Sequence, residues 1–177
     1  MEEAISSQST NSSSISSNNQ INNEISKEVI YSIVTVFNSI IESHKYVNIN
    51  CKNTINFCLK TIPSISLFDY LSRINKYTNL DISTLISALI YIDRFCCNAN
   101  IILNEYNIHT ILFISIYVSI KFHEDISCKD DYYAKIGGLS LEEISKLSLI
   151  FICVLDYKLY INYEDYKRYE NYFWMRC

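Results

Sequence analysis

Glycine and proline are scarce in this sequence, whose 177 residues include only two Gly and one Pro. Because β-sandwiches, β-barrels and dinucleotide-binding folds need these residues at many turns, the shortage disfavours all three classes. The two glycines, Gly137 and Gly138, are adjacent, so a glycine-rich phosphate-binding loop is excluded as well. The sequence therefore predicts an all-α protein of one domain, which is long enough to bury a hydrophobic core.

Positive charge and paired cysteines are lacking too. The formal net charge is −4, which disfavours nucleic-acid binding. The seven Cys form an odd number without a CxxC pair, which indicates reduced thiols in the cytosol or nucleus. Glu2 and Glu3 replace the apolar leader of a signal peptide, and the longest apolar stretch, 108–120, is too short to span a bilayer. We expect a cytoplasmic or nuclear protein that does not bind membranes.

The first 23 residues differ in composition from the rest. Between positions 6 and 23, every residue except Ile15 and Ile21 is Ser, Asn, Gln or Thr. Such a segment cannot bury enough apolar area to offset its conformational entropy. We therefore expect residues 1–23 to form a disordered tail and residues 24–177 to form the folded domain.

Apolar residues recur at helical spacing throughout this domain. Asp81 and Asn162 each precede such a pattern as candidate N-caps, and Ser140 with Glu143 forms a capping box. The patterns predict helical segments over residues 25–46, 67–77, 82–97, 107–123, 130–136, 140–155 and 163–174, with a loop at 47–56.

The segment 107–123 is apolar on nearly every face, with Ser115 and Ser119 as small polar exceptions. A helix without a polar face is buried on all sides, so we expect this one at the centre of the fold. The two serines are small enough to let neighbouring helices approach closely.

Four other positions are interpreted as structural. Asp93 and Arg94 interrupt an apolar helix, and an internal ion pair that fixes helix packing is the favoured explanation. Gly137 occupies the place of a C′ residue after the turn 130–136, so we expect its φ to be positive. The pair Gly137 and Gly138 is thus a backbone requirement rather than a cradle for a ligand.

The candidate reactive groups form only two weak clusters. His123, Glu124 and Asp125 fan out around a helix end, whereas a zinc site needs three or four converging ligands. Cys128 lies five residues from His123, but neither an acidic residue that orients the histidine nor an oxyanion-binding feature can be assigned. We predict no catalytic, metal or cofactor-binding site, and a Cys128-dependent enzyme is the least favoured alternative. The favoured interpretation is an α-helical binding module.

Several runs of residues resemble one protein family in order and spacing. They are PSISLFDYLSRI from Pro63, ALIYIDRF from Ala88, IKFHED from Ile120 and YYAKIGG from Tyr132. Together they are similar to the P-type (also called U-type) cyclins, which are related to the phosphate-signalling cyclins of yeast. The resemblance covers about residues 25–175. It implies a single five-helix cyclin box with an additional N-terminal helix, and no second box.

The resemblance also implies a function, that of a regulatory subunit which binds and activates a cyclin-dependent protein kinase as a heterodimer. The resemblance implies that Lys121 hydrogen-bonds the kinase backbone. Glu124 and Asp125 do not suit the C-terminal end of a helix, so they mark either a solvated loop entrance or a binding surface. On a binding surface, Asp125, placed to pair with Lys121 at i, i+4, would bind a kinase arginine. Ser148 stands where the family usually has Glu, so a cyclin-fold scaffold that activates no kinase remains the alternative. The expected kinase-binding residues are Lys121, Glu124, Asp125, Tyr133, Lys135 and Ser148, with Tyr133 and Lys135 on the rim.

Overall fold

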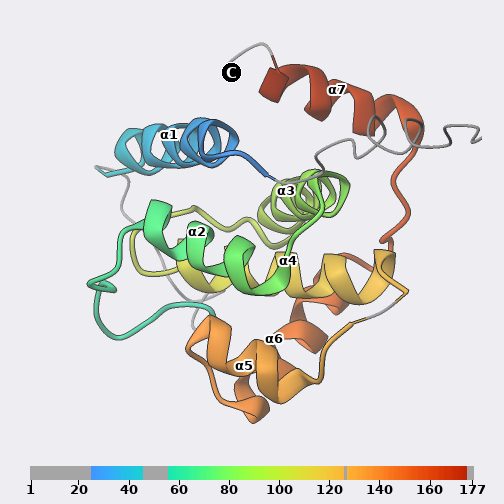
Figure 1. Ribbon diagram of the computed structural model, residues 1–177. Coiled ribbons are helices and arrows are strands. Elements are labelled where there is room, and N and C mark those ends of the chain that lie inside the picture. The colour runs from blue at the N-terminus through green and yellow to red at the C-terminus, as the bar shows by residue number, and fades with distance from the viewer. Residues whose placement is uncertain (1–24, 46–55, 126, 175–177) are drawn as a thin grey trace, which may run out of the picture.

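The computed structural model describes residues 25–45, 56–125 and 127–174, and this part of the chain holds helices and loops but no β-strand (Figure 1). The all-α prediction is confirmed. The predicted tail, 1–23, and nearly all of the predicted loop, 47–56, lie outside the described residues. The described helices are α1 (Lys27–Ser43), α2 (Leu67–Thr78), α3 (Ile82–Ala99), α4 (Ile108–His123), α5 (Asp130–Gly137), α6 (Leu141–Val154) and α7 (Tyr163–Trp174).

The ends of the helices follow the predicted local signals closely. Ser140 and Glu143 form the reciprocal capping box at the start of α6, as predicted. The Asn162 side chain accepts a hydrogen bond from the backbone N–H of Asp165 at 2.7 Å, which caps α7. Asp81 is the N-cap of α3 by position, but its side chain makes no capping hydrogen bond.

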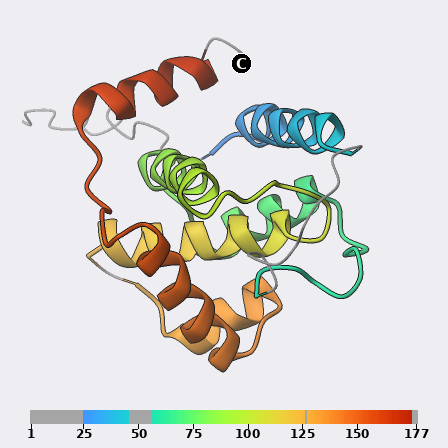
Figure 2. The same cartoon turned by 180° about the vertical axis from the view of Figure 1, so that it is seen from behind.

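Helix α4 lies in the middle of the molecule, with α3 on one side and α5 and α6 on the other (Figures 1 and 2). Every side chain from Ile108 to Ile120 is buried, so the prediction of a central helix is confirmed. The hydroxyl of Ser119 donates to the carbonyl of Thr84 at 2.8 Å, and Ser115 donates to a second α3 carbonyl. The two serines thus bring α4 close to the α3 backbone.

Helix α3 is also long and apolar, and among the described helices it alone is long and apolar enough to cross a membrane. Ten of its side chains are buried inside the protein. It packs against α4, α6 and α7, and these contacts account for its apolar composition as that of a core helix.

The two glycines differ in their roles. Gly137 is the last residue of α5, and the positive φ, +70°, belongs to Gly138, the C-cap. The prediction of a left-handed Gly137 is therefore wrong by one residue. Gly137 is needed for space instead, because a Cβ atom at this position would overlap the ring of Phe113 in α4.

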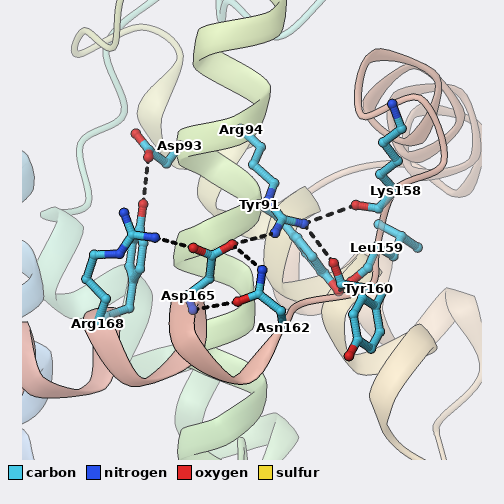
Figure 3. A network of polar contacts seen from close by, with 10 residues as sticks. Tyr91, Asp93, Arg94, Lys158, Leu159, Tyr160, Asn162, Asp165 and Arg168 are labelled. Atoms are coloured by element: carbon cyan, nitrogen blue, oxygen red, sulfur yellow. Dashed lines mark hydrogen bonds and ion pairs between the residues drawn. The ribbon is translucent and has the colours of Figure 1, made fainter.

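Polar contacts attach α7 and the loop before it to α3 (Figure 3). Arg94 lies 3.6 Å from the carboxylate of Asp165 and donates to two carbonyls of the preceding loop at 3.2 and 3.0 Å. Tyr169 donates to Asp93 at 2.6 Å. The predicted internal ion pair is therefore wrong, because Asp93 and Arg94 bind separate residues of another helix.

Candidate functional site

At its C-terminal end α4 leaves the core and reaches the surface just before the connection to α5 (Figure 2). The side chain of Lys121, the first residue after the buried stretch, is 32% exposed. Its ammonium group lies 2.8 Å from the carboxylate of Asp130 and donates to the Ser127 hydroxyl and the Cys128 carbonyl, both at 3.1 Å. The Lys121 ammonium group therefore has one ion pair and two hydrogen bonds within the chain.

Two tyrosine rings complete the surroundings of this ammonium group. Its nitrogen lies 5.7 Å from the ring centroid of Tyr117 and 5.3 Å from that of Tyr133, within the range of a cation–π attraction. Tyr133 is only 3% exposed, and its hydroxyl accepts a hydrogen bond from the backbone of Cys128 at 3.2 Å. The expected place of Tyr133 on an exposed rim is therefore wrong.

The charges at this site are well defined at neutral pH. The 2.8 Å contact with Lys121 holds the pKa of the Asp130 carboxyl below its ordinary value. The position of Asp130 in the first turn of α5 also favours a negative charge. Burial raises the pKa of the Tyr117 and Tyr133 hydroxyls, which stay neutral. One ammonium group is thus paired with one carboxylate.

The two acidic residues after α4 do not pair with Lys121. Asp125 is exposed, and Lys121 forms its ion pair with Asp130 instead. The predicted i, i+4 pair between Lys121 and Asp125 is therefore wrong. Glu124 is half-buried; burial raises the pKa of its carboxyl, whereas a hydrogen bond from Thr84 lowers it. Of these two acidic residues, Asp125 is the more exposed to an external partner.

The remaining predicted residues lie on α5 and α6. Lys135 is exposed on α5. Ser148 is half-buried on α6, and its hydroxyl donates to the backbone carbonyl of Ser145 at 3.2 Å. Ser148 therefore supplies no acidic partner to Lys121, and a role of either residue in partner binding stays a prediction.

Three large apolar side chains on the surface were not among the predicted kinase-binding residues. Phe122 of α4 is 52% exposed, and Leu141 and Leu149 of α6 are 51% and 58% exposed. The sequence contains an indication of these exposed positions in both helices. Phe122 follows the buried stretch at a charged helix end, and the two leucines are eight residues apart, which places them on one helix face. We call Lys121, Phe122, Asp125 and Asp130 the α4 end surface.

His123 was considered both as a metal ligand and as a partner of Cys128. The described residues include no group of three or more His, Cys, Asp or Glu side chains that could hold a metal ion. His123 stacks against Tyr91, and its Nε2 atom lies 3.0 Å from the tyrosine hydroxyl. Burial lowers the pKa of His123. These contacts anchor the end of α4 to α3.

Two grooves lie along α1, separate from the α4 end surface. One of about 510 Å³ lies between α1, α3 and α7, and most of its lining side chains are apolar. The other, of about 830 Å³, lies between α1, the start of α2 and the start of α4. Neither groove includes any residue of the α4 end surface.

Comparison with known proteins points to one family. The family profile described as Cyclin matches residues 2–159. Cyclin-U2-2 of Arabidopsis thaliana is 35% identical over 114 residues, which cover 64% of this chain and 50% of the relative. PHO85 cyclin-like protein psl1 of Schizosaccharomyces pombe is 36% identical over 117 residues, covering 65% and 48%. PHO85 cyclin-7 of Saccharomyces cerevisiae is 32% identical over 124 residues, covering 63% and 44%.

The matched regions agree with the architecture of the chain. This sequence spans about half the length of the curated relatives that it matches. The five consecutive helices α2–α6, preceded by α1, agree with the expected box of five helices and an additional N-terminal helix. The profile match ends at residue 159, before α7 begins.

Proposed function

Since this chain belongs to the cyclin family, we propose that it binds a cyclin-dependent serine/threonine protein kinase and activates it as the regulatory subunit of a heterodimer. In this proposal the chain catalyses no reaction itself and needs no cofactor. The complex acts in the cytoplasm or the nucleus.

The observation that carries this proposal is the exposed Phe122 beside the fully paired Lys121. The preceding 13 residues of α4 are buried, so burial in the core explains their apolar character. It does not explain a phenyl ring that is 52% exposed. Aromatic side chains near the centre of an interface commonly supply much of the binding free energy.

The buried part of α4 makes this end of the helix rigid. A rigid element presents its side chains with little loss of conformational entropy on binding, which favours affinity. Leu141 and Leu149 are two further exposed apolar side chains, on α6, which packs directly against α4. We propose that the kinase covers both helices, with Asp125 inside the interface and Lys135 in its polar rim.

The names of two yeast relatives suggest which partner to test first. PHO85 cyclin-7 and PHO85 cyclin-like protein psl1 are both associated with PHO85 by name. We extend that association to this chain and propose a PHO85-type kinase as its partner.

A scaffold that binds partner proteins without activating a kinase is the second candidate. Ser148 favours it, because a neutral side chain stands at the position expected to be acidic, and its hydroxyl bonds within α6. Binding without an increase in kinase activity would support the scaffold.

The test combines binding and activity measurements with the purified chain and a PHO85-type kinase. We expect a saturable complex and a faster phosphorylation of peptide substrate when the chain is added. Phe122→Ala should weaken binding at least tenfold, because it removes the exposed aromatic anchor. The matched control is Tyr31→Ala, which removes an exposed aromatic ring from α1, across the molecule from α5 (Figure 1). Equal effects of the two substitutions would contradict this binding surface.

Charge reversal provides a second measurement on the same surface. Asp125→Arg should weaken kinase binding at least tenfold without changing the circular dichroism spectrum, because Asp125 is exposed on the surface. Native affinity of the folded variant would exclude Asp125 from the interface.

A further inference from the structure

Asp130 is the carboxylate that fixes the charged group of the α4 end surface. Its Oδ1 atom lies 2.8 Å from the nitrogen of Lys121, whereas the other two partners of that nitrogen are a neutral hydroxyl and a neutral carbonyl. We propose that Asp130 is a positioning residue, which holds Lys121 in the orientation that the kinase recognises. The proposal deepens the proposed function and rests on it.

The location of Asp130 suits this role. It is the first residue of α5, where the helix dipole favours a carboxylate, and the side chain is 46% exposed. The acidic partner of Lys121 therefore belongs to α5. Ser148 of α6, where the family usually has Glu, donates its hydrogen bond within α6. The acidic group that is missing from α6 is thus supplied from a different helix.

The surroundings restrict how Lys121 can meet a partner. Its ammonium group lies beside two tyrosine rings and is bonded within the chain, so its long side chain has little freedom left to lose on binding. A kinase carbonyl can reach it only by replacing one of the three present acceptors. The Ser127 hydroxyl and the Cys128 carbonyl are both neutral and belong to exposed residues; the hydroxyl is the group that exchanges, because a side chain can turn away without moving the backbone. Asp130 stays in place, since its ion pair with Lys121 is charge-assisted.

Four substitutions separate this role from a general effect of charge. Asp130→Asn removes the charge with little change of shape, and Asp131→Asn does the same at the next residue, which is exposed in the same first turn of α5. Ser127→Ala removes the exchangeable acceptor. By calorimetry with the kinase, we expect Asp130→Asn to raise the Kd at least tenfold, and Asp131→Asn and Ser127→Ala to change it less than twofold. Asp130→Glu should recover part of the affinity.

A double-mutant cycle tests whether Asp130 acts through Lys121. If it does, Lys121→Met combined with Asp130→Asn should bind no more weakly than Lys121→Met alone. Additive losses would show that Asp130 acts independently of Lys121 and would overturn the proposal. Circular dichroism spectra must confirm that every variant is folded.

The remaining outcomes distinguish this inference from the proposed function. If the unmodified chain binds the kinase and Asp130→Asn binds with the same Kd, only the role of Asp130 is wrong. Equal losses in Asp130→Asn and Asp131→Asn would likewise reduce it to a general effect of charge. If the unmodified chain binds no cyclin-dependent kinase, the proposed function fails, and this inference fails with it.

Discussion

Helices α4 and α7 both pack against α3, but different forces hold them there. Helix α4 buries 13 consecutive side chains, and its two serines bond to the α3 backbone. The described side chains of α7 are exposed or half-buried. Tyr169 packs against the core, and the polar contacts with α3 are a hydrogen bond to Asp93 and an ion pair with Arg94. One helix is thus attached by extensive apolar burial, and the other by little apolar burial and a few directional polar contacts.

This difference indicates which parts of the fold can change without loss of the whole. Apolar burial contributes about 25 cal/mol per Å², so the contacts of α4 add up over a large area. A partly exposed ion pair contributes about 1 kcal/mol or less, and salt weakens it. We therefore expect α7 to open locally, while α4 separates from α3 only when the domain unfolds.

The largest effect is expected in the middle of α4. Ile114 is fully buried, and Ile114→Asp would place an unpaired carboxylate in the core. Its cost of several kcal/mol is comparable with the whole stability of a small domain, about 5–15 kcal/mol. Circular dichroism should show an unfolded chain. Leu149→Asp, at an exposed position of α6, is the control and should remain folded; a folded Ile114→Asp would contradict the central position of α4.

The next effect concerns the contact of α4 with α5. Gly137→Ala would place a methyl group against the ring of Phe113, and overpacking of this kind costs roughly 1–3 kcal/mol. Urea denaturation should show this loss, and a second substitution, Phe113→Leu, should recover part of it. Gly138→Asn is the control, because Asn tolerates a positive φ better than most residues. If both glycine variants lost equal stability, backbone strain rather than space would explain Gly137.

A smaller and local effect is expected at α7. Arg94→Met removes the ion pair with Asp165 and two hydrogen bonds to the preceding loop, so the backbone amides of α7 should exchange with deuterium faster. The global free energy of unfolding should fall by no more than about 1 kcal/mol. Arg168→Met, whose partner Asp165 lies on the same helix, is the matched control. Equal exchange in the two variants would show that Arg94 does not hold α7.

The smallest effect is a dependence of stability on pH that arises in α4. Burial lowers the pKa of His109 in the folded protein, so the unfolded chain takes up this proton at a higher pH than the folded chain does. Neutral His109 therefore contributes to the free energy of unfolding above pH 6.5, and this contribution is lost as the pH falls below that value. Urea denaturation at pH 7.5 and 5.5 should show a smaller difference for His109→Gln than for the unmodified chain. An identical difference would contradict the assignment.

The candidate site shows which contacts can be predicted from sequence patterns and which cannot. Lys121 was identified by its resemblance to a family motif, and its place at the end of a buried helix was predicted correctly. The ion-pair partner of Lys121 was not predicted correctly. Asp130 is nine positions away on another helix, whereas the i, i+4 pattern considers only the residue one helical turn away. Tyr133 was placed on the surface for the same reason, since its burial depends on how α5 meets α4.

The amino-acid sequence alone determined the all-α class, the positions of the helices, the capping box at Ser140 and the burial of α4. These features depend on residues within about four positions of one another, where helical geometry determines which side chains share a face or come into contact. Only the tertiary structure decided that Gly137 makes room for Phe113, that Arg94 binds α7 and that Asp130 pairs with Lys121. Each of these contacts joins different helices, and their meeting depends on how the whole core packs rather than on any local pattern.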